Sequence, residues 1–159
     1  MALPRAKQLN LQQHLGLGIF GIQSSSGITV DSQVPDLAGD FEIYDRCVST
    51  VEGGRVDVYY QGQLQESQGR INEIKVPIKG STNSVNCQYR LKVFAEGSAD
   101  TPVYDSTLTN APVTRSLLTI ASGSISPHPT GEGRYHVLVE AYLNTGETLY
   151  VGRPFVKQR

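Results

Sequence analysis

The chain has 159 residues, the size of one domain, so a second independent core is not expected. Charged residues make up 18% of it, and 14 basic against 15 acidic side chains leave a formal net charge of −1. The basic residues are scattered singly along the chain, which disfavours a nucleic-acid partner. The content of glycine, proline and tyrosine favours a fold rich in strands and turns over a helical bundle.

Residues 1–39 differ from the rest of the chain. Between Gln8 and Val30 there is no Asp, Glu, Lys or Arg, which is unusual for a free tail, because disordered segments usually stay soluble through charge. We therefore expect an extended N-terminal arm, residues 1–39, that docks on a neighbouring copy or another protein. Its predicted interface residues are Leu15, Leu17, Ile19, Phe20 and Ile22.

From residue 40 onward the apolar period is two, as in half-buried strands. The clearest strand is 85–95, with Val85, Leu91 and Val93 on one face. Residues 134–143 repeat the pattern and place Val137 and Val139 inward. After Asn144-Thr-Gly146, residues 147–156 are predicted to return as the second strand of a hairpin.

Weaker alternation predicts further strands, and turn residues separate them. Pro77 cannot donate to a ladder, so its strand is expected to lie at a sheet edge or to end there. Seven or eight short strands over residues 40–159 predict an all-β, two-sheet β-sandwich as a single domain. The additional strands are expected at 41–51, 55–60, 71–79, 102–108 and 113–121.

The stretch from Ile125 through Ala141 resembles the end of an immunoglobulin-like or fibronectin-type sandwich. It has a corner rich in proline and glycine, Pro127 to Gly133, followed by Tyr135 at the start of a strand. The resemblance implies an immunoglobulin-like sandwich in which the Tyr135 hydroxyl bonds to the corner backbone. It implies nothing about function, because that class of sandwich serves unrelated roles.

Two patterns suggest catalytic or nucleotide chemistry, and neither has the context it needs. Gly16, Gly18 and Gly21 match G-x-G-x-x-G, but no helix is predicted after them, so they are expected to serve the packing of the arm. Serines such as Ser124 lie in loops without a nucleophile-elbow context. We expect no cofactor, no catalytic residues and no enzymatic activity.

The potential metal ligands are scattered. The three histidines, His14, His128 and His136, do not fall at zinc-ligand spacing, so no metal site is expected. The two cysteines, Cys47 and Cys87, both have inward parity and are expected to be buried free thiols, with one inter-strand disulfide as the alternative. One acidic cluster is present: Asp36, Asp40, Glu42 and Asp45. It offers too few ligands for a calcium ion, so we interpret it as the solvated entry to the first strand.

Four aromatic side chains are predicted to face outward from their strands: Tyr59, Phe94, Tyr142 and Phe155. If several are exposed, they form either a protein interface or a platform on which a sugar stacks. Because the chain has no tryptophan, the interface is the favoured interpretation.

These features together predict a structural protein, a self-associating or partner-associating β-sandwich such as a component of a bacteriophage or virus particle. The predicted partners are further copies or other proteins of the assembly, with no nucleic acid and no membrane, since no segment has the roughly 20 apolar residues of a span. Such a protein would fold in the host cytoplasm and then enter the particle. The alternative is an immunoglobulin-like adhesion or glycan-binding or protein-binding module, secreted or at the cell surface.

Overall fold

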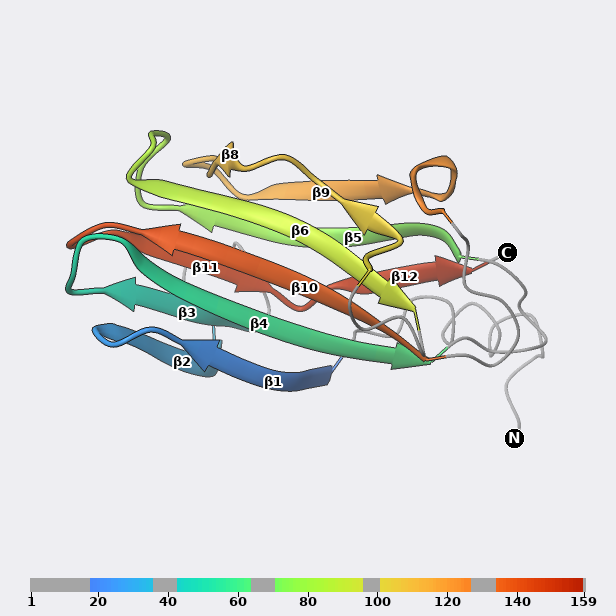
Figure 1. The fold of residues 1–159 in the computed structure, drawn as a ribbon, viewed down its shortest axis with the longest axis horizontal. Helices are drawn as coiled ribbons and strands as arrows, with labels where there is room; N and C mark the ends of the chain where they lie inside the picture. Colours follow the sequence, from blue (N-terminus) through green and yellow to red (C-terminus); the bar gives the residue numbers. More distant parts are fainter. Residues whose placement is uncertain (1–17, 36–42, 64–70, 96–100, 127–133, 159) are drawn as a thin grey trace.

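A computed structural model describes residues 18–35, 43–63, 71–95, 101–126 and 134–158. In this part of the chain, two antiparallel sheets lie face to face (Figure 1). Sheet I has the order β1-β4-β10-β6-β7, with β8 beside β6. Its strands are β1 (Gly18–Ser24), β4 (Gly54–Gln63), β6 (Cys87–Ala95), β7 (Tyr104–Asp105), β8 (Thr109–Asn110) and β10 (Arg134–Leu143).

Sheet II has the order β12-β5-β11-β3-β2, with β9 beside β5. Its strands are β2 (Ile28–Pro35), β3 (Ile43–Ser49), β5 (Ile71–Gly80), β9 (Ser116–Ala121), β11 (Thr148–Gly152) and β12 (Phe155–Gln158). One 3₁₀ turn, Ser122–Ser124, is the helical element of the described residues. The predicted dominance of strands is confirmed, and within the described ranges no helix is long and apolar enough to cross a membrane.

Consecutive strands repeatedly change sheet. The chain passes from β1 in sheet I to β2 in sheet II, from β3 back to β4, and from β10 to β11. Three of these crossings turn at glycines with positive φ, Gly27 (87°), Gly53 (66°) and Gly146 (83°), a conformation that L side chains rarely adopt. This connectivity makes the fold a jelly roll, with twelve strands in the described ranges, so the prediction of an immunoglobulin-like sandwich with seven or eight strands is corrected.

The hairpin predicted around Asn144-Thr-Gly146 is wrong. β10 pairs with β4 and β6, whereas β11 pairs with β3 and β5, so the turn joins the two sheets. The predicted edge position of Pro77 is also wrong, because β5 has neighbours on both sides. On one side, β5 pairs first with β12, as far as Lys75–Phe155, and then with β11, from Ile78–Val151 onward. Pro77 lies between these two pairs and has no partner residue on that side. It is tolerated there because no backbone N–H is needed.

Residues 18–35 belong to the two sheets and do not form an arm that reaches a neighbour. Ile22 of β1 pairs with Val58 of β4, and Val30 of β2 pairs with Cys47 of β3. The predicted boundary at residues 39 and 40 therefore does not separate the sandwich from the segment before it. Residues 1–17 lie outside the described part of the chain.

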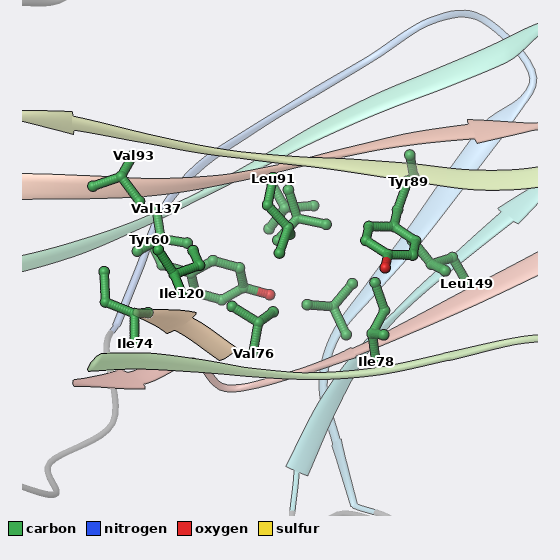
Figure 2. Packing of buried hydrophobic residues seen from close by; sticks show 14 of the residues in the cluster. Tyr60, Ile74, Val76, Ile78, Tyr89, Leu91, Val93, Ile120, Val137 and Leu149 are labelled. Carbon is green, nitrogen blue, oxygen red and sulfur yellow. The ribbon is translucent and has the colours of Figure 1, made fainter. Parts of the chain in front are cut away.

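The core lies between the inner faces of the sheets (Figure 2). Leu91 is 3% exposed, and Val93, Val137 and Val139 are fully buried, as predicted. Val85 is 71% exposed, which corrects its assignment to the core. Val85 lies in the turn before β6, so the apolar alternation of the sequence extends beyond the strand itself.

Other predicted core features have mixed outcomes. Cys47 and Cys87 are buried and free, in agreement with the thiol interpretation, and burial raises the pKa of Cys47 to about 12. The ring of Tyr135 is fully buried, but its hydroxyl has no hydrogen-bond partner among the described residues. The corner 127–133, which was expected to accept that bond, lies outside them.

A hydrogen bond also joins the two sheets through the core. The Tyr60 hydroxyl on β4 donates to the Asp45 carboxylate on β3, and both residues are buried. Burial and the neighbouring carboxylate raise the pKa of Tyr60 well above its ordinary value, so the phenol stays protonated as a donor.

Candidate functional site

The outward side chains of β4, β10 and β6 form one continuous surface, here called the outer face of sheet I. The register places Arg55, Tyr142 and Gln88 in one row across the three strands. Further along the strands, Tyr59, Leu138 and Lys92 form another row. The outer face comprises Arg55, Asp57, Tyr59 and Gln61 of β4, Gln88, Arg90, Lys92 and Phe94 of β6, Arg134, His136, Leu138, Glu140 and Tyr142 of β10, and Asp105 of β7.

Two side chains of β10 are buried although they point away from the core. Leu138 is 3% exposed and Glu140 is 2% exposed, so that residues 137–141 form an uninterrupted buried run. Leu138 is not part of the hydrophobic cluster between the sheets. The outer face of sheet I therefore has two buried side chains at its centre.

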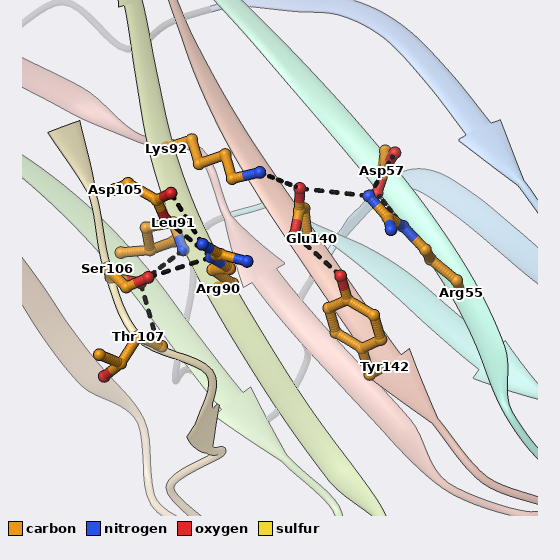
Figure 3. Close-up of polar contacts among 10 residues, drawn as sticks. All are labelled: Arg55, Asp57, Arg90, Leu91, Lys92, Asp105, Ser106, Thr107, Glu140 and Tyr142. Carbon is orange, nitrogen blue, oxygen red and sulfur yellow. Dashed lines mark hydrogen bonds and ion pairs between the residues drawn. The ribbon is translucent and has the colours of Figure 1, made fainter. Parts of the chain in front are cut away.

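Glu140 is the centre of a polar network on this face (Figure 3). Its Oε1 lies 2.9 Å from Lys92 Nζ and 3.2 Å from Arg55 Nη2, and its Oε2 accepts a hydrogen bond of 3.0 Å from the Tyr142 hydroxyl. Burial alone would raise the pKa of Glu140, but the contacts with Lys92, Tyr142 and Arg55 outweigh it and lower the pKa below its ordinary value. Glu140 is therefore a carboxylate at neutral pH.

Arg55 and Arg90 are both held by carboxylates. Arg55 donates through Nε and Nη2 to the two oxygens of Asp57, at 3.1 and 3.3 Å, and its guanidinium lies 5.2 Å from the centre of the Tyr142 ring. Arg90 donates to the two oxygens of Asp105, at 2.7 and 2.8 Å (Figure 3). Such forked pairs fix the orientation of the guanidinium plane.

Aromatic rings flank this network. Tyr59, Phe94 and Tyr142 are all half-buried. Gly21 of β1 pairs with Tyr59, and a Cβ added there would meet nothing within 4 Å, which leaves open space beside the tyrosine. At about 3.3 Å per residue, the span of β6 from Gln88 to Phe94 is about 20 Å long, enough for several units of a linear ligand.

The structure gathers some of the predicted site residues and separates others. All four predicted outward aromatics do face outward: Tyr59, Phe94 and Tyr142 share the outer face of sheet I, and Phe155 lies on sheet II opposite Lys75. The ion-pair network was not predicted, because its members come from four strands. The only sequence signal was the set of polar residues that alternate with apolar ones along each strand.

The predicted interface residues are only partly described. Ile22 is 37% exposed on β1, whereas nothing is described of Leu15 and Leu17 or of the side chains of Ile19 and Phe20. Gly18 and Gly21 of the glycine motif lie in β1, a strand, where the nucleotide fingerprint requires a turn into a helix.

Among the described residues, no group of three or more histidine, cysteine or acidic side chains is arranged to hold a metal ion. Of the acidic residues weighed for calcium, Asp45 is buried against Tyr60, and Asp36, Asp40 and Glu42 lie outside the described residues, as do His14 and His128.

No protein-family model and no curated protein sequence matches the chain. Solved structures are similar in fold. The carbohydrate-binding module TmCBM61, in complex with β-1,4-galactotriose, has a TM-score of 0.57 at 12% identity and matches over 87% of this chain and 88% of its own. The family 11 carbohydrate-binding module from Clostridium thermocellum, in complex with a β-1,3-1,4-mixed-linked tetrasaccharide, has a TM-score of 0.54 at 14% identity, over 91% and 94%.

The fold also occurs within larger proteins. The enzymatically active domain of a tailspike protein of bacteriophage CBA120 matches over 100% of this chain but only 21% of its own, with 13% identity and a TM-score of 0.53. At these identities the likeness concerns the fold alone: an all-β jelly-roll sandwich like that of carbohydrate-binding modules.

The predicted role as a structural particle component, with further copies or assembly proteins as partners, is corrected by these findings. Its main premise was a docking arm, and residues 18–35 instead complete the sheets of their own domain. Its other premise was an immunoglobulin-like fold, and the fold is instead similar to that of modules solved with oligosaccharides bound.

Proposed function

We propose that this domain is a carbohydrate-binding module that binds an oligosaccharide chain on the outer face of sheet I. One observation carries the proposal: three half-buried aromatic side chains and a network of hydrogen-bonding groups around Glu140 lie on the same face of sheet I. The similarity in fold to modules solved with galactotriose and a mixed-linked tetrasaccharide supports it.

The chemistry of this face suits a sugar. The C–H faces of a pyranose pack against aromatic rings, which Tyr59, Phe94 and Tyr142 supply. Sugar hydroxyls both donate and accept, and the carboxylates of Asp57 and Asp105 have lone pairs beyond those that the arginines use. Because the buried Glu140 already contacts Lys92, Arg55 and Tyr142, binding costs less side-chain entropy there than it would on a mobile surface.

The electrostatics favour binding over hydrolysis. A glycosidase needs one carboxylic acid that is protonated at its working pH, which requires a raised pKa. The pKa of Glu140 is lowered instead, by the contacts with Lys92, Tyr142 and Arg55 that outweigh its burial. We therefore propose a non-catalytic role for this domain, which is compatible with its being one module of a larger enzyme.

The proposal favours the alternative location considered from the sequence, secreted or at the cell surface, where polymeric glycans are encountered. Cell fractionation with an antibody against the domain tests it. A signal confined to the cytosol would contradict it.

The binding experiment is affinity electrophoresis and calorimetry with β-1,4-galactan and β-1,3-1,4-glucan. We expect retention of the wild-type domain by at least one of them, and a loss of about tenfold or more in affinity for Tyr59→Ala and for Tyr142→Ala, since a stacked ring contributes roughly 1 kcal/mol or more beyond its buried area. Phe155→Ala is the matched control, because it removes an outward aromatic from sheet II.

Wild-type protein that binds no glycan of the pair would contradict the proposal. So would variants Tyr59→Ala and Tyr142→Ala that bind as tightly as Phe155→Ala does.

A further inference from the structure

We propose that Asp57 and Asp105 are specificity-determining residues: by occupying Arg55 and Arg90, they restrict the outer face of sheet I to uncharged sugars and exclude uronic acids. This inference rests on the proposed glycan-binding function. It concerns the charge that the ligand carries.

The charges at the centre of the outer face of sheet I balance. Three cations and three carboxylates lie there, and each cation contacts at least one of these carboxylates. The cations are Arg55, Arg90 and Lys92, and the carboxylates are Asp57, Asp105 and Glu140. Arg134, the first residue of β10, adds a fourth cation at the end of the face. The centre of the face therefore offers no excess positive charge to a ligand carboxylate.

Each of these three cations is already engaged by a carboxylate. Arg90 uses Nε and Nη2 on Asp105, and its Nε is also 3.1 Å from the Ser106 carbonyl. Arg55 is shared between Asp57 and Glu140, and Lys92 lies 2.9 Å from the same Glu140 oxygen. A uronic acid placed beside one of these cations would also lie close to the carboxylate that the cation already contacts, and that carboxylate would repel it.

Two further residues of the outer face, His136 and Arg134, bear on its charge. Burial and Arg134 lower the pKa of His136, so this ring is neutral at pH 7 and adds no cation. Arg134 is the first residue of β10, two residues before His136 and six before Glu140 in the same strand. It is therefore the cation to test separately.

The experiment compares neutral and acidic probes. Wild-type domain, Asp105→Asn and Asp57→Asn are titrated with β-1,4-galactotriose, a mixed-linked β-glucan tetrasaccharide and an oligogalacturonate, at roughly 0.05 M and 0.5 M salt. Glu73→Gln is the matched control, because it removes one negative charge from sheet II, where Glu73 lies 3.8 Å from Lys75.

We expect the wild-type domain to bind a neutral probe with an affinity that changes less than about twofold between the two salt concentrations, and to bind oligogalacturonate at least tenfold more weakly. Asp105→Asn should gain about tenfold in oligogalacturonate affinity, and the gain should disappear at high salt. Asp57→Asn should gain less, because Glu140 still engages Arg55. Glu73→Gln and Arg134→Gln should bind all probes as the wild type does.

The possible failures are distinguishable. Wild-type protein that binds none of the probes overturns the proposed function and this inference together. Wild-type protein that prefers oligogalacturonate, or binding of a neutral probe that weakens strongly with salt, overturns the inference and leaves glycan binding in place. A folded Asp105→Asn that gains nothing, checked by its melting curve, also overturns it.

Discussion

The outer faces of the two sheets carry similar residue types in different states. On sheet II, Tyr44 and Tyr150 pack edge to face with ring centres 5.2 Å apart, and Arg46 lies 2.6 Å from Asp31, with both of these side chains about 40% exposed. On sheet I, Glu140 is 2% exposed and is shared by two cations and a tyrosine hydroxyl. An exposed pair can open to solvent at little cost, whereas a buried carboxylate with three partners holds its surroundings rigid.

This difference explains why we assign binding to sheet I. Aromatic and charged residues alone do not distinguish the faces, since both have them. The faces differ in how deeply their polar side chains are buried and in how many contacts those side chains make. Both properties determine how much side-chain entropy is lost when a ligand binds.

The largest expected effect contrasts the two sides of one strand. Leu91 points into the core and is 3% exposed, whereas Lys92, the next residue, lies on the outer face of sheet I. Leu91→Ala should lower the free energy of unfolding by about 2 to 5 kcal/mol, through lost burial and the cavity left behind. Urea unfolding measures it, and Val85→Ala, at a position that is 71% exposed, is the control that should change little.

The next effect contrasts the carboxylates of the two faces. Glu140→Gln should cost about 2 to 4 kcal/mol in unfolding free energy, because Lys92 and Arg55 lose the charge that compensates them. Asp31→Asn should leave the melting temperature nearly unchanged, since its pair with Arg46 is open to solvent. Equal effects of the two substitutions would remove the distinction between the faces.

A smaller effect concerns the two tyrosines. Tyr142→Phe keeps the ring beneath Arg55 and removes only the hydrogen bond to Glu140, so a loss of about 1 kcal/mol is expected by thermal unfolding. Tyr150→Phe keeps the contact with Tyr44 and should change stability less. A larger loss for Tyr150→Phe would show that the second face is the more tightly ordered.

The smallest effect near neutral pH is the contribution of Glu140 to the pH dependence of the unfolding free energy. Its pKa in the folded protein lies below the ordinary value of 4.5, so the stability it contributes is complete above pH 4.5 and is lost as the pH falls through the lowered pKa. The difference in unfolding free energy between wild type and Glu140→Gln should stay constant from pH 7 to 5 and shrink below pH 4.5. A difference that shrinks between pH 7 and 5 would mean that Glu140 takes up its proton there.

Much of the strand content could be predicted from alternation. The segments 71–79 and 134–143 coincide closely with β5 and β10, and the outward positions of Tyr59, Phe94 and Tyr142 followed from the same parity. Alternation reports a local property, namely which side of a strand meets the core, so it is reliable where strands are long.

Other features depend on which strands become neighbours, and alternation carries no such information. The turn at Gly146 marks a reversal of the chain, but the partners of β10 and β11 are chosen by packing between the sheets. For the same reason residues 18–35, whose glycines and lack of charge suggested an arm, instead pair with β4 and β3. The Glu140 network joins residues far apart in sequence and could not be predicted before the order of β4, β10 and β6 was known.

The most direct test of the account is a map of the bound ligand on the protein, by following backbone amide NMR signals during titration with the neutral oligosaccharide that binds best. The account predicts that the largest shifts fall on residues 55–61, 88–94 and 136–142, with Tyr44, Arg46 and Tyr150 of sheet II unaffected. Shifts centred on sheet II, with those three segments unchanged at saturation, would contradict the assignment of the binding face.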